Sequence, residues 1–221
     1  MWFRRRKEKS AIDAVRFDTS GWKQHESSAE HRLWLTPSSD AVALRRQEPP
    51  PAYPYDFRSL PAARAFYAEE SAQRGGVMIS VDFVDSSGID VMRGVFKYRS
   101  PEPGSLAMYY VGVIALLRRT CAFQINAESV EVGSTGAREA AVMAMGDGPP
   151  ALQEEEVVVA SASDLFAKMG EARIKRLPAD DERYDDMFPD HPLSKVRSLQ
   201  KRILETLEVD DSFREQPPYR K

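Results

Sequence analysis

The chain has 221 residues, of which 42% are hydrophobic and 29% are charged, so its composition is that of a globular protein and excludes a membrane-embedded class. Its 31 basic and 34 acidic residues nearly cancel, which excludes the strong positive field that draws a protein to nucleic acid or anionic lipid. Cys121 has no second cysteine for an intrachain disulfide, and the longest apolar run, residues 106–117, is too short for a transmembrane helix. We therefore expect a cytoplasmic protein with no membrane span and no nucleic-acid partner.

Residues 1–30 differ from the rest of the chain because they are polar and their apolar residues follow no clear period. A basic cluster, Arg4 to Lys7, stands near their start, and no apolar signal-peptide core follows it. The sequence therefore predicts three parts. These are a loosely ordered basic arm over residues 1–30, an antiparallel α+β core over residues 31–150, and an acidic extension over residues 151–221 that contains an amphipathic helix.

The core is predicted to begin with a β-hairpin. Two short apolar alternations, residues 32–36 and 41–45, flank residues 37–40, whose composition favours a turn. Residues 47–57 then carry four prolines and three aromatic residues, which is typical of an extended connection. The aromatic side chains of this connection either pack on their own domain, the interpretation we favour, or bind an aromatic groove on a partner.

A helix and four long strands are predicted next. Ser59 is a suitable N-cap for a helix that ends at Gly75 and Gly76. Strict alternation over residues 77–84 and a turn at residues 85–88 predict an antiparallel hairpin. Two further strands are predicted over residues 105–117 and 121–132.

A glycine turn follows the last of these strands and leads into a strongly helical stretch, residues 137–145. Such a turn presents free backbone N–H groups to an anion at a helix N-terminus, and an arginine beside it could add a bidentate contact. The hypothesis assigns anion binding to Gly133, Ser134, Thr135, Gly136 and Arg138. The alternative is that the glycines only permit a tight turn, because the lysine of a P-loop is missing.

An acidic segment later in the chain offers carboxylate oxygens and one imidazole, which are ligands for a divalent metal if they converge. The candidate ligands are Asp181, Asp185, Asp190 and His191. Their spacing matches neither a calcium loop nor a two-metal site, so the alternative is a solvated acidic loop in which Asp190 caps the last helix. We expect a short strand at residues 157–159 before this segment.

The last predicted helix runs from about Pro192 to Val209 and is amphipathic. Its apolar stripe includes Val196, Leu199, Ile203 and Leu207. This stripe either packs on the chain's own sheet, which we expect, or is reserved for a partner or a second copy, in which case these four residues are the partner-binding surface.

Taken together, these elements predict an α+β fold in which an antiparallel sheet is covered by helices in a layered sandwich. The stretch from about Arg32 to Met145 resembles bacterial PsbP-like proteins in its paired hairpins, its strand entry from Gly104 to Gly112 and its exit into a helix from Glu131 to Glu139. The segment from Tyr184 to Ser194 is similar to a group of bacterial proteins with an FPDHPLS-type sequence, here Phe188 to Ser194. The resemblance implies a protein that mostly acts by binding other proteins, including as a chaperone of hydrophobic helices.

No catalytic signature is present. The pentapeptide G-x-S-x-G does not occur, and Cys121 stands among apolar residues of a predicted strand, where an inert buried thiol is expected. We therefore expect a non-enzymatic protein-binding, chaperone-like or adaptor-like protein of the bacterial cytoplasm, with no cofactor. The alternative is a metal-assisted hydrolase that uses the acidic and histidine segment near residues 180–191. The oligomeric state does not follow from the sequence.

Overall fold

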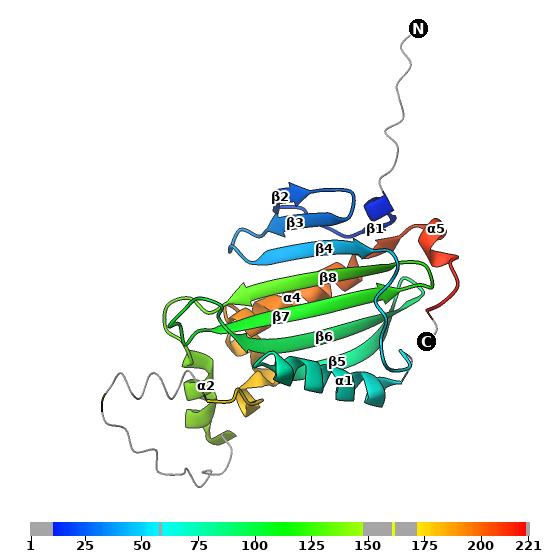
Figure 1. The fold of residues 1–221 in the computed structure, drawn as a ribbon. Coiled ribbons are helices and arrows are strands. Elements are labelled where there is room, and N and C mark those ends of the chain that lie inside the picture. The colour runs from blue at the N-terminus through cyan, green and yellow to red at the C-terminus, as the bar shows by residue number, and fades with distance from the viewer. Residues whose placement is uncertain (1–10, 58, 148–160, 162–171, 220–221) are drawn as a thin grey trace.

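The computed structural model describes residues 11–57, 59–147, 161 and 172–219. A seven-stranded antiparallel sheet with strand order β2-β3-β4-β8-β7-β6-β5 forms its centre (Figure 1). The strands are β2 (Lys23–Ser27), β3 (His31–Leu35), β4 (Ala41–Gln47), β5 (Val77–Ser86), β6 (Ile89–Arg99), β7 (Met108–Leu117) and β8 (Ala122–Val130). The strand predicted at residues 157–159 lies outside the described residues.

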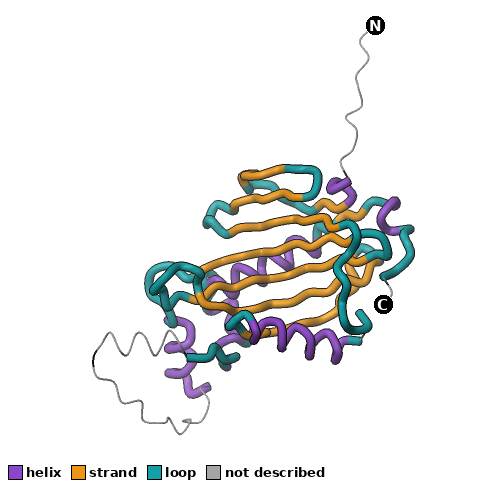
Figure 2. The backbone as a smooth tube through the Cα atoms, in the orientation of Figure 1, coloured by secondary structure: helices purple, strands orange, loops and turns teal. Residues whose placement is uncertain are grey.

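Helices lie on both faces of this sheet (Figures 1 and 2). Helix α1 (Leu60–Gln73) packs on β5, and helix α4 (Pro192–Glu205) packs on β7 and β8 from the opposite side. The layered α+β sandwich expected from the sequence is thus confirmed. The shorter helical segments are η1 (Ala11–Ala14), α2 (Ala137–Val142), η2 (Met143–Asp147), η3 (Pro178–Asp180), η4 (Glu182–Met187) and α5 (Asp211–Arg214). Among the described residues, no helix combines the length and apolarity that a bilayer crossing requires.

The predicted hairpins are present with regular antiparallel register. Leu33 pairs with Ala43 in the first hairpin, and Asp85 pairs with Asp90 next to the turn of the second. The cap of α1 is also as expected, because Ser59 Oγ accepts a hydrogen bond from Ala62 N at 3.3 Å. Local turn and cap residues therefore determine where these elements begin and end.

The face of the sheet that α4 covers carries the larger apolar core. Aliphatic and aromatic side chains from β4, β6, β7 and β8 meet α4 and α5 there, and most of them are fully buried. The core includes Val42, Leu44, Val91, Ile114, Leu116, Phe123, Ile125, Ile203 and Phe213. Burial of each large aliphatic side chain stabilises the fold by about 1.5–3 kcal/mol.

The opposite face is covered over β5 and β6 by α1 and residues 47–57. Tyr55 and Phe57 of the proline-rich connection are buried against Phe96 and Ala115 of the sheet. The aromatic residues of this connection therefore pack on their own domain, which confirms the interpretation favoured from the sequence.

The N-terminal region joins the folded core at an earlier residue than the sequence predicts. Residues 1–10 lie outside the described residues, but Ile12 and Val15 are 0% and 1% exposed within the main core. Strand β1 (Val15–Arg16) pairs with β9 (Glu208–Val209), so the N-terminal segment is fixed by a strand from the far end of the sequence. The prediction of a loose arm up to residue 30 missed this because two apolar residues without a visible partner show no period.

Helix α4 ends at Glu205 rather than near Val209, because the chain turns there into β9. Its apolar stripe packs on the chain's own sheet, as expected. Val196 and Ile203 are fully buried, Leu207 is buried after the helix ends, and Leu199 is partly buried against the same core. The assignment of Val196, Leu199, Ile203 and Leu207 to partner binding is therefore corrected.

Close approach of α4 to the sheet depends on Gly112. A Cβ atom at this position would lie 2.7 Å from Val196 Cγ1 and 2.8 Å from Gln200 Cδ, which is closer than atoms in contact can come. Gln200 Nε2 reaches past it to donate to the carbonyl oxygens of Gly94 at 2.9 Å and Val113 at 3.2 Å. A glycine in β7 thus places the polar middle of α4 against the sheet.

Candidate functional site

Charged side chains meet at the end of the sheet where α2, η3, η4 and the first turn of α4 come together. Two of them, Lys97 and Arg138, are only 2% and 1% exposed, although such residues are almost never fully buried without partners. We call this set the ionic cluster. Its members are Lys97, Glu131, Arg138, Glu139, Asp180, Asp185, His191 and Arg197.

Arg138 of α2 connects three segments of the chain. Its Nε donates to the carbonyl oxygen of Ala179 at 2.7 Å, and its Nη1 donates to Ser194 Oγ at 2.7 Å. Its Nη2 donates to the carbonyl oxygen of Asp181 at 2.8 Å and to Asp185 Oδ1 at 2.9 Å. Four of the five N–H groups of this guanidinium are therefore occupied within the protein.

Asp185 lies between two guanidinium groups. Besides Arg138, it accepts hydrogen bonds from Arg197 Nη1 at 3.0 Å and 3.2 Å, while Arg197 Nη2 donates to the carbonyl oxygen of Asp180 at 2.6 Å. The two guanidinium groups balance the negative charge of Asp185, and their hydrogen bonds connect η3 and η4 to α4.

Lys97 of β6 is the second buried cation. Its Nζ lies 2.9 Å from Asp180 Oδ1 and 3.6 Å from Glu139 Oε1, and it stands 5.8 Å from the centre of the Tyr110 ring. Asp180 is itself 1% exposed, and its Oδ2 accepts a hydrogen bond from Leu177 N at 2.8 Å. The acidic segment predicted to be solvated is therefore partly buried, because Lys97 and Arg138 supply the opposite charge that burial requires.

Glu131 and His191 form the third part of the cluster. Glu131 Oε2 accepts a hydrogen bond from Met108 N at 2.8 Å, and His191 Nε2 lies 3.5 Å from Glu131 Oε1. Burial alone would raise the pKa of Glu131, but His191 and the backbone N–H groups of Met108 and Gly136 lower it below 4.5. Glu131 is thus a carboxylate at neutral pH.

The glycine turn predicted to bind an anion already contacts a carboxylate of its own chain. Gly136 N donates to Glu131 Oε1 at 3.3 Å, and Gly133 and Gly136 both have positive φ, the backbone region that glycine permits. Arg138 points away into the ionic cluster. An anion site for external ligands at Gly133, Ser134, Thr135, Gly136 and Arg138 stays a prediction, but its arginine has internal partners.

The four predicted metal ligands do not converge. Asp181 Oδ1 accepts a hydrogen bond from Arg183 N at 3.0 Å, Asp185 pairs with arginines, and Asp190 is exposed. His191, rather than Asp190, caps α4, because its Nδ1 accepts a hydrogen bond from Leu193 N at 3.2 Å. In the described part of the chain, the set able to hold a metal is instead Glu131, Glu139 and His191, which corrects the ligand assignment.

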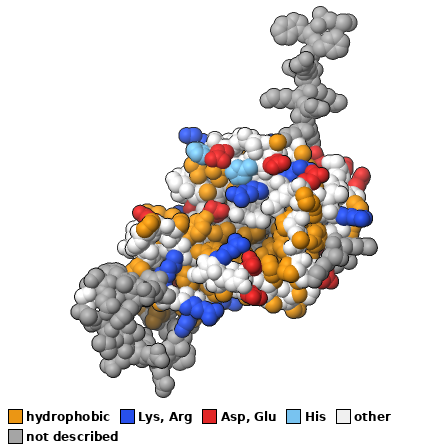
Figure 3. Space-filling model, in the orientation of Figure 1, with side chains coloured by type: hydrophobic (Ala, Val, Ile, Leu, Met, Phe, Trp, Pro, Cys, Tyr) orange, Lys and Arg blue, Asp and Glu red, His pale blue; other side chains and the backbone are white. Residues whose placement is uncertain are grey.

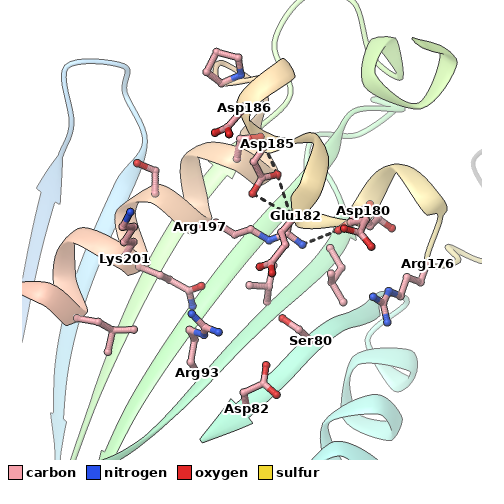
Figure 4. A pocket seen from close by; sticks show the side chains of 18 of the residues that line it. Ser80, Asp82, Arg93, Arg176, Asp180, Glu182, Asp185, Asp186, Arg197 and Lys201 are labelled. Atoms are coloured by element: carbon pink, nitrogen blue, oxygen red, sulfur yellow. Dashed lines mark hydrogen bonds and ion pairs between the residues drawn. The ribbon is translucent and has the colours of Figure 1, made fainter. Parts of the chain in front are cut away.

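A charged cavity of about 880 Å³ opens between α4, η4 and strands β5 and β6 (Figure 4). Arg197 in this cavity is paired with Asp185 and with the backbone at Asp180, as the dashed lines show. Acidic side chains outnumber basic ones in its lining, seven (Asp82, Asp180, Asp181, Glu182, Asp185, Asp186, Glu205) to four (Arg93, Arg176, Arg197, Lys201). Two of these acids are already paired with buried cations, Asp180 with Lys97 and Asp185 with Arg138, so the cavity is a polar surface of mixed charge.

A second hollow, which we call the aromatic groove, lies on the opposite face of the sheet beside α1 and measures about 440 Å³. In the space-filling view of this face, hydrophobic side chains gather over the middle of the sheet (Figure 3). The groove is lined by Tyr53, Phe66, Tyr67, Phe96, Tyr98, Tyr109, Val111 and Val113 on its apolar side, and by Gln124, Asn126 and Glu128 on its polar side. All of these residues except Phe96 are half-buried.

The polar side of the groove is a row of hydrogen-bonded side chains along β8. Gln124 Nε2 donates to Asn126 Oδ1 at 2.8 Å, and Asn126 Nδ2 donates to Glu128 Oε1 at 3.2 Å. Tyr109 donates its hydroxyl to Glu128 at the end of the row. The row ends in a carboxylate that still has lone pairs for a donor from outside.

The tyrosines of the groove stay neutral well above neutral pH. Burial is the main cause of a raised pKa for Tyr53, Tyr67 and Tyr109, and the carboxylate of Glu128 adds to the effect at Tyr109. These hydroxyls therefore act as neutral donors and acceptors around an apolar floor, which is the usual composition of a binding site.

Sequence reasoning missed both the groove and the ligand set that includes Glu131 and Glu139. The alternation of Gln124, Asn126 and Glu128 with apolar residues predicts one polar side of a strand, but it does not show that aromatic residues from other elements face this side. Likewise, Glu139 in a helical stretch is not distinguishable by sequence from a solvated surface residue.

Comparison with known proteins leaves the fold without a family. No family model and no curated protein matches the chain. Among solved structures, a crystal structure from Bacteroides thetaiotaomicron VPI-5482 is similar over 60% of this chain and 44% of that chain, with a TM-score of 0.34 and 13% identity. The match thus spans less than half of that protein.

Proposed function

We propose that this chain is a non-enzymatic binding protein of the bacterial cytoplasm that holds an amphipathic, basic segment of a protein partner in the aromatic groove. The observation that carries the proposal is the open part of the sheet between α1 and β4, where tyrosines and valines line a hollow that no other described segment fills. The resemblance of the sequence to PsbP-like proteins, which mostly bind other proteins, supports the same function.

The chemistry of the groove supports an amphipathic occupant. Tyr98 and Tyr109 pair across β6 and β7, and Phe96 pairs with Val111, so two rows of apolar surface run beside the polar row of β8. Tyrosine is favoured where one end of a contact is apolar and the other is wet. A helix with leucines on one side would place them on these rows and its polar side chains near Asn126 and Glu128.

The charge of the groove favours a basic occupant. Glu70 and Glu128 both line it, and Arg74, the basic residue of its lining, is already paired with Glu70 at 3.0 Å. A lysine or arginine of the partner would therefore meet Glu128 without a competing cation from this chain's lining.

The alternative function, a metal-assisted hydrolase that uses Asp181, Asp185, Asp190 and His191, has less support. Asp185 is neutralised by two arginines, and Asp190 is on the surface. These side chains do not meet around a common point where a metal could activate water.

The proposal is tested with two synthetic helical peptides of about five turns, one of leucine and lysine and one of leucine and glutamate. Fluorescence anisotropy should show that the full chain binds the lysine peptide at least about tenfold more tightly than the glutamate peptide. Val111→Lys, which places a cation in the floor, should weaken binding of the lysine peptide by a similar factor.

Val132→Lys is the matched control, because Val132 is 86% exposed and lies outside the groove. Glu128→Gln, a substitution that changes charge but hardly size, should weaken the lysine peptide without changing the circular dichroism spectrum. Equal affinity of both peptides, or a lysine peptide that binds Val111→Lys and Glu128→Gln as tightly as the parent, would contradict the proposal.

A further inference from the structure

Three polar atoms at the ionic cluster are buried and have no partner at hydrogen-bond distance among the described residues. They are Tyr110 Oη, Glu139 Oε2 and His191 Nε2, the last of which lies 3.5 Å from Glu131 Oε1, a distance too long for a good hydrogen bond. Buried polar groups almost always have a partner, so each such atom needs an explanation, and here the three belong to neighbouring residues. Their common neighbourhood indicates a site built for a ligand that carboxylate and imidazole groups bind.

The side chains at this site have the composition and spacing of a metal centre. Glu131, Glu139 and His191 each offer one ligand atom, and the three atoms lie within 4.8 Å of one another. Imidazole nitrogen together with carboxylate oxygen suits divalent first-row metals, and zinc most often takes three protein ligands when a fourth position is left open. Magnesium and calcium prefer oxygen ligands alone.

Tyr110, which is not one of these three residues, provides a further observation. Its side chain is fully buried, its ring meets the His191 ring edge-on with 5.3 Å between centres, and its hydroxyl has no hydrogen-bond partner in the part of the chain that the structure describes. Burial and the nearby carboxylates of Glu139, Asp180 and Glu131 raise its pKa, so the hydroxyl stays protonated at neutral pH. A neutral phenol there can donate to a carboxylate ligand or to a metal-bound water.

The charges of the ionic cluster are consistent with a bound cation. Four carboxylates, Glu131, Glu139, Asp180 and Asp185, stand against three permanent cations, Lys97, Arg138 and Arg197, and His191 adds a positive charge only when it is protonated. Buried charge without compensation is strongly destabilising, so an additional positive charge at the carboxylate-rich side would be favourable.

We propose that Glu131, Glu139 and His191 bind one divalent transition-metal ion, with Zn²⁺ as the best fit, and that this ion joins the end of β8 to α2 and α4. The remaining contacts allow it. Lys97 occupies only Oε1 of Glu139 and leaves Oε2 unpaired, and a cavity of about 410 Å³ that Glu131 and His191 line provides entry.

Metal binding at this site would change the hydrogen bonding of His191. Metal binding at Nε2 requires the ring proton to reside on Nδ1, where Leu193 N now donates at 3.2 Å. The cap contact must therefore loosen when the metal binds, and the backbone amide of Leu193 reports on it. An ion that bound elsewhere on the chain would leave that amide unchanged.

The test uses the full chain after removal of metals with a chelator. Isothermal titration with ZnCl₂ should give one binding site, zinc should raise the melting temperature, and MgCl₂ and CaCl₂ should do neither. His191→Gln and Glu139→Gln should each weaken zinc binding at least about a hundredfold, because loss of a ligand costs no less than loss of a residue that orients one. The NMR signal of the Leu193 amide should shift in the parent.

Two controls separate this site from other carboxylate and imidazole groups. Asp190→Asn changes the exposed acid next to His191, and His31→Gln changes a surface histidine whose Nδ1 lies 3.4 Å from Glu26 Oε2. Both variants should bind zinc as the parent does. Circular dichroism of each metal-free variant confirms folding, with Glu139→Gln as the second variant if His191→Gln does not fold. Absence of one-site zinc binding in the parent, or binding that survives Glu139→Gln, would overturn the proposal.

Discussion

The two faces of the sheet are covered to different extents, and β7 shows the difference within one strand. Ile114 and Leu116 point to the face under α4 and are fully buried, whereas Tyr109 and Val111 point to the aromatic groove and are half-buried. Aliphatic side chains gain only from leaving water, but tyrosine keeps its hydroxyl hydrated or paired. A face can therefore stay open where tyrosines and a polar row replace isoleucine and leucine.

The first prediction, with the largest expected effect, concerns the ionic cluster on the covered side. Arg138→Met should lower the free energy of unfolding by about 3–5 kcal/mol, because it removes one of the two guanidinium partners of Asp185 and leaves two backbone carbonyl groups without their buried donor. Urea unfolding at neutral pH measures this. Arg138→Lys retains the charge but not the planar set of guanidinium donors. Its free energy of unfolding should therefore lie between those of the parent and of Arg138→Met. A loss below about 1 kcal/mol for Arg138→Met would mean that the cluster contributes little.

The second prediction compares two residues of α4 on the covered face. Ile203→Ala should cost about 2–5 kcal/mol, because Ile203 is fully buried. Leu199→Ala should cost less, about 1 kcal/mol, because Leu199 is only partly buried against the same core. Both values come from the same unfolding measurement, and the reverse order would show that α4 packs with a different side toward the sheet.

The third prediction concerns the aromatic side and has the smallest effect at neutral pH. Burial raises the pKa of Tyr55 from 10.0 to about 12, and its hydroxyl has no hydrogen-bond partner in the described structure. Tyr55→Phe should therefore change stability by less than about 0.5 kcal/mol at pH 7.

The same substitution should alter the alkaline side of the stability curve. The unfolded chain loses the phenolic proton above pH 10, while the folded protein retains it up to about pH 12, so stability falls as the pH rises through this window. Tyr55→Phe should make that fall less steep in unfolding measurements between pH 9 and about pH 12. An unchanged slope would show that Tyr55 ionises equally in both states.

Much of the fold follows from local signals in the sequence. Strict alternation in residues 77–84, a turn at residues 37–40 and the Ser59 cap each act over a few residues, so their consequences are readable without the rest of the chain. The two apolar residues of the N-terminal segment are different. Ile12 and Val15 find their partner in Val209, and no local pattern indicates contact between positions so far apart.

The candidate sites depend on such distant contacts. Asp180 and Asp181 are adjacent acids in one acidic run, yet Asp180 is 1% exposed against Lys97 and Asp181 is on the surface. The sequence indicated the chemistry of the segment, and His191 was correctly singled out as a candidate ligand type. The sequence did not indicate which acidic residues lie near His191, because Glu131 and Glu139 come from parts of the chain outside the acidic segment.

The pairing of β1 with β9 also constrains the order of events during biosynthesis. Residues 11–16 are synthesised before the sheet, whereas Glu208 and Val209, which pair with β1, are synthesised only after all seven of its strands. Ile12 and Val15 therefore remain without their final cover while nearly the whole sheet is being synthesised. Closure between segments this far apart is slow, and exposed apolar residues attract chaperones and promote aggregation meanwhile. Completion of the core therefore waits for the segment around Val209, which is made after the whole sheet and joins the first described segment of the chain.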